Sequence, residues 1–223
     1  RDLVRSRGLG DVYKRQNLSI YTPSLYLFES VRGDYTIDYE GNGHLSIDGR
    51  EKGLRKLMAT NLLKRLESSV NSFRLTLTRI CEYINETIEA INRYESTHSE
   101  SLMMVADFSE DWDVADSEAD VFATRKSKIS LRDMDYVSWR KDLKADLEKL
   151  NLLLLLLKDI TPRHDAKLQM LIEDLKQKFS HPLNEGNKKV LIFTAFADTA
   201  DYLYTELAAR IKQECGLNVA LIT

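Results

Sequence analysis

The chain has 223 residues, of which 43% are apolar and 30% are charged, and its formal net charge is −3. These proportions predict one or two globular units with a sizeable core, and they exclude a disordered or collagen-like chain. The longest apolar run is Leu152 to Leu157, well short of the roughly 18 residues that cross a bilayer. We expect no membrane partner, no basic-then-apolar leader and a cytoplasmic location.

Cysteines and histidines are few and scattered. Cys81 and Cys215 have no paired spacing, and none of the four histidines has neighbouring ligands. Neither a disulfide framework nor a zinc site is therefore predicted. We expect both thiols to be reduced and structural, with no bound metal.

Residues 1–16 resemble a translated sequencing adaptor. A common transposase end, GAT GTG TAT AAG AGA CAG, encodes the residues from Asp11 to Gln16, and the preceding adaptor bases give Ser6 to Gly10. We therefore interpret residues 1–16 as non-native and leave them out of the fold prediction. The alternative is a genuine basic arm.

Two segments follow that differ in composition. Residues 17–53 contain several glycines among aromatic and β-branched residues, which favours loops with at most short strands. Residues 54–100 contain apolar side chains three or four residues apart, the period of one helical face, which predicts a long amphipathic helix over about 54–94. These side chains are Leu66, Val70, Phe73, Leu77, Ile80, Ile84, Ile88 and Ile91.

Residues 101–132 are acidic and then basic. Residues 107–120 hold seven acids and no base, so this stretch predicts a solvated loop or linker. Arg125, Lys126 and Lys128 follow at once. They could contact DNA or neutralise the preceding acids, and we favour the second interpretation.

Residues 133–187 are predicted to be helical. A helix over about 134–160 keeps the four-and-three spacing at Leu143, Leu147, Leu150, Leu154 and Leu157. Further leucines cover its other faces at the C-terminal end, so we expect that end to be buried nearly all round. A shorter helix is predicted over 165–179, after Pro162.

Residues 188–223 have the pattern of a β-α-β unit. The apolar run 188–194 is typical of a buried parallel strand, a helix is predicted over 198–214 with Asp198 as its cap, and residues 217–222 form the second predicted strand. The turn after Thr194 would place a hydroxyl and free helix amides together, which suits a phosphate. The alternative is a core strand and a capped helix without a ligand.

Two segments resemble bacterial superfamily 2 helicases of the Swi/Snf-like (DEAD/DEAH-type) group. The first is Asn61-Leu62-Leu63-Lys64-Arg65-Leu66-Glu67-Ser68-Ser69, which continues to Phe73-Arg74-Leu75-Thr76-Leu77. The second comprises Asp165-Ala166-Lys167-Leu168, then Lys189 to Thr194, then Asp198 to Leu203. Phe193-Thr194-Ala195-Phe196 is similar to helicase motif IV. Together they cover about a third of the chain after residue 16.

The resemblance implies an α/β protein with a large helical part. Long interlobe helices would be followed by the first β-α-β unit of a second RecA-like lobe, of the P-loop NTPase type, starting at residue 188 and truncated. It also implies an ATP-dependent DNA helicase or translocase, acting in nucleic-acid remodelling, repair or restriction-type defence. DNA would be its partner, and ATP with Mg²⁺ its cofactors.

The resemblance also indicates what this chain lacks. A P-loop requires a Gly-Lys pair, and the sequence contains none. We therefore interpret the chain as a fragment without catalytic or cofactor-binding residues, its parent carrying an N-terminal RecA-like lobe, the remainder of the C-terminal lobe and, in some relatives, a fused nuclease domain.

Five residues are candidate DNA contacts. Lys64 and Ser68 are four residues apart on the predicted helix, as are Arg65 and Ser69, so each pair shares a face that could meet backbone phosphates. Thr194 is the fifth, at the end of the predicted strand. The alternative for these residues is a solvated or interlobe polar face. The alternative function is a helical protein-interaction or scaffold module without enzymatic activity.

Overall fold

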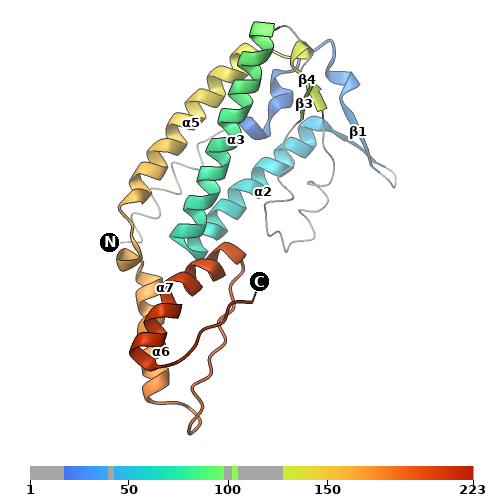
Figure 1. Ribbon diagram of the computed structural model, residues 1–223. Coiled ribbons are helices and arrows are strands. Elements are labelled where there is room, and N and C mark those ends of the chain that lie inside the picture. Colours follow the sequence, from blue (N-terminus) through green and yellow to red (C-terminus); the bar gives the residue numbers. More distant parts are fainter. Residues whose placement is uncertain (1–17, 40–42, 98–101, 105–127, 223) are drawn as a thin grey trace. The chain divides into compact units, whose positions relative to one another are not determined.

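The computed structural model describes residues 18–39, 43–97, 102–104 and 128–222. Helices dominate these residues (Figure 1). The chain divides into two compact units, Arg1–Leu63 with Leu77–Leu153 and Lys64–Thr76 with Leu154–Thr223. They are called the first unit and the second unit below, and each is described separately. No helix in the described part of the chain is both long and apolar enough to cross a membrane.

The long helix predicted over 54–94 forms as two helices, α2 (Ile47–Ser68) and α3 (Val70–Thr97). The break is at Ser69, whose Oγ accepts hydrogen bonds from the backbone N–H groups of Asn71 (3.1 Å) and Ser72 (3.2 Å). A serine in this position satisfies amide groups that the first turn of a helix leaves without partners. Local capping chemistry therefore interrupts the predicted helix at Ser69.

The apolar stripe of α3 is buried as its spacing predicts. Its buried members are Phe73, Leu77, Ile80, Ile84, Ile88 and Ile91. A stripe of this width hides one face of a helix and leaves the other in water. The period-based prediction is confirmed for this helix.

Helix α5 (Tyr136–Lys158) differs from the prediction at its leucine-rich end. Leu150, Leu153 and Leu157 are buried, but Leu152, Leu155 and Leu156 are 57%, 63% and 58% exposed. The expectation that this end is buried all round is therefore wrong. One packed stripe hides only part of the circumference of a helix, so the remaining leucines of the run face outward.

In the first unit, side chains of the helices form hydrogen bonds with an N-terminal segment of short 3₁₀ turns. These turns are η1 (Ser19–Tyr21) and η2 (Pro23–Tyr26). The buried carboxylate of Asp146 on α5 accepts from the backbone N–H (2.7 Å) and hydroxyl (2.8 Å) of Ser19. Trp139 Nε1 donates to the Ser19 carbonyl over 3.0 Å. The Trp139 side chain is itself buried.

The remaining elements of the first unit are short. A 3₁₀ turn, η3 (Arg32–Asp34), precedes the hairpin of β1 (Thr36–Tyr39) and β2 (Gly43–Ser46), which pair antiparallel. β3 (Leu102–Met104) pairs antiparallel with β4 (Lys128–Ser130), and η4 (Leu131–Asp133) follows. The acidic tract, Arg125 and Lys126 lie outside the described residues. No side-chain placement is described for Lys128.

The second unit contains η5 (Pro162–His164), α6 (Ala166–Ser180) and α7 (Ala197–Cys215). Asp165 caps α6 by accepting from Leu168 N–H over 3.1 Å. Gly216 ends α7 in the left-handed conformation (φ 70°), which a glycine adopts without strain. Both helices agree with the predicted ranges. Their shared core consists of Leu168, Ile172, Leu175, Leu207 and Ile211.

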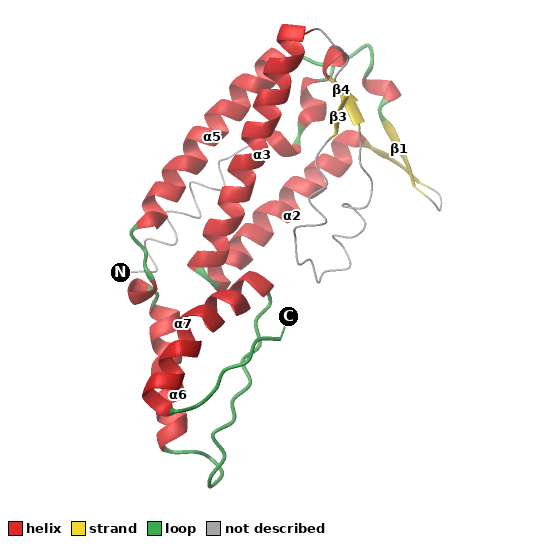
Figure 2. Ribbon diagram, in the orientation of Figure 1, coloured by secondary structure: helices red, strands yellow, loops and turns green. Residues whose placement is uncertain are grey.

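The predicted α/β class is wrong for the described residues. The runs 188–194 and 217–222 form no strand and no β-α-β unit, and Figure 2 shows both as loop. The strand pairs that the described residues do form are β1 with β2 and β3 with β4, both antiparallel. A buried parallel strand requires neighbouring strands for its backbone and cover on both faces. Neither run has such a neighbour, so apolar composition alone does not produce a RecA-like sheet here.

The thiol of Cys81 on α3 generates a pH prediction. Burial, followed by the charge of nearby Glu82, raises the pKa of this thiol from 9.0 to about 11. Between those pH values the unfolded chain has lost the thiol proton and the folded chain retains it, so the free energy of unfolding falls as the pH rises. Urea titrations at several pH values should show a shallower decline for Cys81→Ala than for the unchanged protein. Equal slopes would contradict the raised pKa.

Candidate functional site

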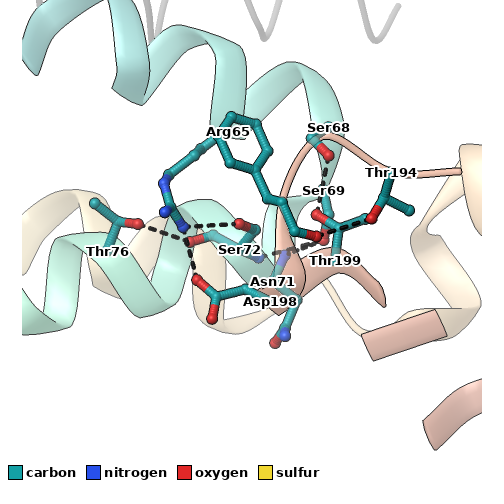
Figure 3. A network of polar contacts seen from close by, with 10 residues as sticks. Arg65, Ser68, Ser69, Asn71, Ser72, Thr76, Thr194, Asp198 and Thr199 are labelled. Atoms are coloured by element: carbon teal, nitrogen blue, oxygen red, sulfur yellow. Dashed lines mark hydrogen bonds and ion pairs between the residues drawn. The ribbon is translucent and has the colours of Figure 1, made fainter. Parts of the chain in front are cut away.

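The polar centre of the second unit is an ion pair between Arg65, near the end of α2, and Asp198, in the first turn of α7. Arg65 Nη1 lies 2.6 Å from Asp198 Oδ2, and the Arg65 side chain is only 2% exposed (Figure 3). The guanidinium also lies over the Phe196 ring, 4.7 Å from its centroid. A charge removed from water in this way needs both a counter-charge and hydrogen-bond acceptors. The Asp198 carboxylate supplies the counter-charge.

Hydroxyl groups surround the ion pair. Arg65 Nη1 donates to Ser72 Oγ over 3.3 Å, and the Ser68 and Thr199 hydroxyls share a hydrogen bond of 2.9 Å. Thr194 Oγ1 donates to the Phe196 carbonyl over 2.9 Å. These groups come from two separate stretches of the chain, 65–72 and 194–199, which meet in Figure 3. The network therefore connects the α2–α3 junction with the start of α7 inside the second unit.

Local backbone structure presents these side chains. Ser69 N–H donates to the Arg65 carbonyl over 2.9 Å, and Phe73 N–H donates to the Ser69 carbonyl over 3.1 Å, so the chain stays nearly helical across the break. At the start of α7, Thr199 N–H and Ala200 N–H both donate to the Phe196 carbonyl. The first turn of α7 is thereby fixed with Asp198 in it.

The interpretation of Asp198 as the cap of α7 is wrong. The cap position is Phe196, and no side chain caps this helix end. The Asp198 carboxylate is instead directed to Arg65. A helix N-terminus favours negative charge, so the carboxylate is compatible with its position in the first turn of α7.

A cavity of about 290 Å³ lies beside this network within the second unit. Its carboxylates are those of Asp165, Asp198, Asp201 and Glu206, and its one guanidinium is that of Arg74. Arg74 Nη2 donates to the carbonyls of Leu157 (2.9 Å) and Ile160 (2.8 Å). The surplus of negative charge makes this cavity unsuitable for a phosphate.

The acids in this cavity also have structural tasks. Asp165 Oδ2 accepts from the Tyr202 hydroxyl over 3.0 Å. Burial, followed by the charge and the hydrogen bond of Asp165, raises the pKa of Tyr202 well above its ordinary value. No group of histidine, cysteine and carboxylate side chains that could hold a metal ion occurs among the described residues.

The five predicted contact residues divide by exposure. Lys64 is exposed, whereas Arg65 is buried against Asp198 and Ser69 is buried as the cap of α3. Ser68 and Thr194 are half-buried and hydrogen-bonded to Thr199 and to the Phe196 carbonyl. Four of the five therefore belong to one network, and Lys64 is the exposed residue next to it. Their contact with DNA stays a prediction.

Sequence reasoning missed the partners in this network. The sequence predicts no individual role for Phe196, Ser72 or Thr199. For Asp198 it predicts a different role, the cap of the helix over 198–214. The sequence did contain a signal for this network. The short polar run at the α2–α3 junction and the acid that follows an aromatic residue, Asp198 after Phe196, both belong to the helicase-like segments. Nothing in local spacing joins residues 133 positions apart.

Comparison with known proteins adds no relative. No family model, no curated protein and no solved structure matches this chain.

The ion pair predicts a large stability effect. Asp198→Ala leaves the buried Arg65 guanidinium without its counter-charge, so the free energy of unfolding should fall by about 3 kcal/mol, as for other broken buried pairs. Asp201→Ala, one turn further along α7, is the control and should cost less than about 1 kcal/mol. Urea denaturation followed by circular dichroism measures both. Equal losses in the two variants would show that the pair contributes nothing specific.

Proposed function

We propose that this chain is part of an ATP-dependent DNA helicase or translocase of superfamily 2, in which the Arg65 network joins two segments that work on DNA. One observation supports the proposal above all. The two stretches that resemble this helicase group, 61–77 and 189–203, meet through the Arg65–Asp198 pair and the Ser68–Thr199 hydrogen bond. Residues that act together on one strand need a common rigid support.

Exposed charge supports a role in binding the DNA backbone. Helix α2 exposes Lys52, Lys56 and Lys64, and Glu67 is exposed one turn after Lys64. Exposed lysines attract phosphates without reading base sequence. In this proposal Lys64 contacts the DNA, while Arg65 and Ser69 position the helix junction.

ATP and Mg²⁺ would be bound by parts of the motor outside these 223 residues, since the chain has no Gly-Lys pair. The contribution of this chain to the motor would be mechanical. It would hold DNA and carry movement between the parts that close on the nucleotide.

The exposed leucines of α5 favour a second candidate function. Leu155 and Leu156 lie three and four residues after Leu152 on the helix, and all three face outward. An amphipathic helix with such a face can bind a partner helix or groove. A helical interaction module without enzymatic activity is therefore the alternative, and it requires no affinity for DNA.

DNA titration separates the two functions. Fluorescence anisotropy with a short duplex at several salt concentrations should show binding that weakens steeply as salt rises. Lys64→Ala should lower the slope of log affinity against log salt by about 0.9, because one phosphate contact is lost. Lys144→Ala, an exposed lysine of α5, is the control and should leave the slope unchanged. The absence of salt-dependent binding would favour the interaction module.

The Thr194 hydroxyl allows a second measurement in the same assay. If this group also meets a phosphate, Thr194→Val should weaken binding by about 1 kcal/mol, the net contribution of one hydrogen bond, and leave the salt slope unchanged. Affinity equal to that of the unchanged protein would restrict Thr194 to its contact with the Phe196 carbonyl.

A further inference from the structure

The cavity of about 290 Å³ in the second unit is lined by three polar side chains that the protein itself leaves unused. Among the described residues, the side chains of Asn71, Asp201 and Glu206 form no hydrogen bond and no ion pair. Asn71 and Glu206 are half-buried, and Asp201 is exposed. A few polar groups that converge on a concave space are the usual sign of a ligand site.

The other charged groups of the cavity are engaged within the protein. Asp198 pairs with Arg65, and Asp165 accepts from the Tyr202 hydroxyl. Arg74 donates to two carbonyls at the C-terminal end of α5. Two carboxylates and one amide therefore remain for a bound molecule, and the charge that they favour is positive.

Helix α7 sets the spacing of the two remaining carboxylates. Its cavity-lining residues are Asp198, Asp201, Tyr202, Thr205 and Glu206, a spacing of three and four residues that places them on one face of the helix. Asp201 and Glu206 are five residues apart, so their backbone positions differ by about 7.5 Å along the helix axis. An extended molecule with two separated charges matches this arrangement better than a single ion does.

The remaining wall of the cavity is apolar and consists of Val70, Leu75, Ile160 and Pro162. An aliphatic chain gains contacts from such a wall, whereas a hydrated metal ion gains none. The described residues also contain no group of side chains that could hold a metal ion. The lining therefore favours an organic cation.

We propose that this cavity binds a short alkyl diamine, an aliphatic chain with an ammonium group at each end. Asp201 and Glu206 each accept from one ammonium group, and the Asn71 carbonyl is a further acceptor. An ammonium group has three donors and no acceptor, so it suits a site made of oxygen atoms. The apolar wall covers the chain between the two charges. This inference does not depend on the proposed function.

Calorimetric titration of the full chain tests the charge and the chain separately. The ligands are 1,4-diaminobutane, n-butylamine and 1,4-butanediol, which carry two, one and no charges on the same four-carbon chain. The diamine should bind on the order of tenfold more tightly than the monoamine, because the monoamine loses one charge-assisted hydrogen bond. The diol should not bind. Absence of diamine binding, or equal affinities for the diamine and the monoamine, would overturn the proposal.

Substitution locates the diamine in the cavity. Asp201→Asn combined with Glu206→Gln should weaken diamine binding by on the order of tenfold or more, because both counter-charges are removed. The matched control combines Glu173→Gln with Asp174→Asn, which removes two exposed carboxylates of α6 outside the cavity lining and should leave the affinity unchanged. Equal losses in the two double variants would overturn the site and indicate attraction to the net charge of the chain alone.

Discussion

Arg65 imposes the central constraint on the second unit, because a guanidinium that is almost completely buried requires a carboxylate. The Asp198 carboxylate supplies it over 2.6 Å, and Ser72 supplies a further acceptor. Removing either charge alone would leave the other in a poorly hydrated place, which makes such pairs costly to break even where their net contribution to stability is small. The pair therefore fixes which residue of α7 meets the α2–α3 junction. The hydroxyl contacts of Ser68 and Thr199 follow from that placement.

Local patterns predicted the helices well. The spacing of Phe73, Leu77 and Ile80 located the buried face of α3, because this signal acts over one or two turns. The failure of the predicted sheet concerns long-range structure. The run 188–194 reads as a buried strand by composition, but a strand forms only where other strands meet it. Local composition carries no information about whether those strands are present.

The candidate site was predictable in part for the same reason. The position of Lys64 and Ser68 on one helix followed from their spacing, and the exposure of Lys64 agrees with a surface role. The burial of Arg65 did not follow, because its counter-charge comes from residue 198. The network has the character of a structural joint. It contains a buried ion pair and hydroxyl groups that bond to one another. A joint of this kind suits a protein whose proposed work is to hold DNA and transmit movement.

Hydrogen exchange tests the joint most directly. If Arg65 anchors the start of α7, replacing it by Met should speed amide exchange in the first turns of α7, because their local opening no longer has to break an ion pair. Amides of α3 between Leu77 and Ile91, in the first unit, serve as the internal reference and should exchange at unchanged rates. Faster exchange confined to the second unit is the result that this account predicts. Unchanged exchange in α7 of a folded Arg65→Met variant would contradict the central role of the pair.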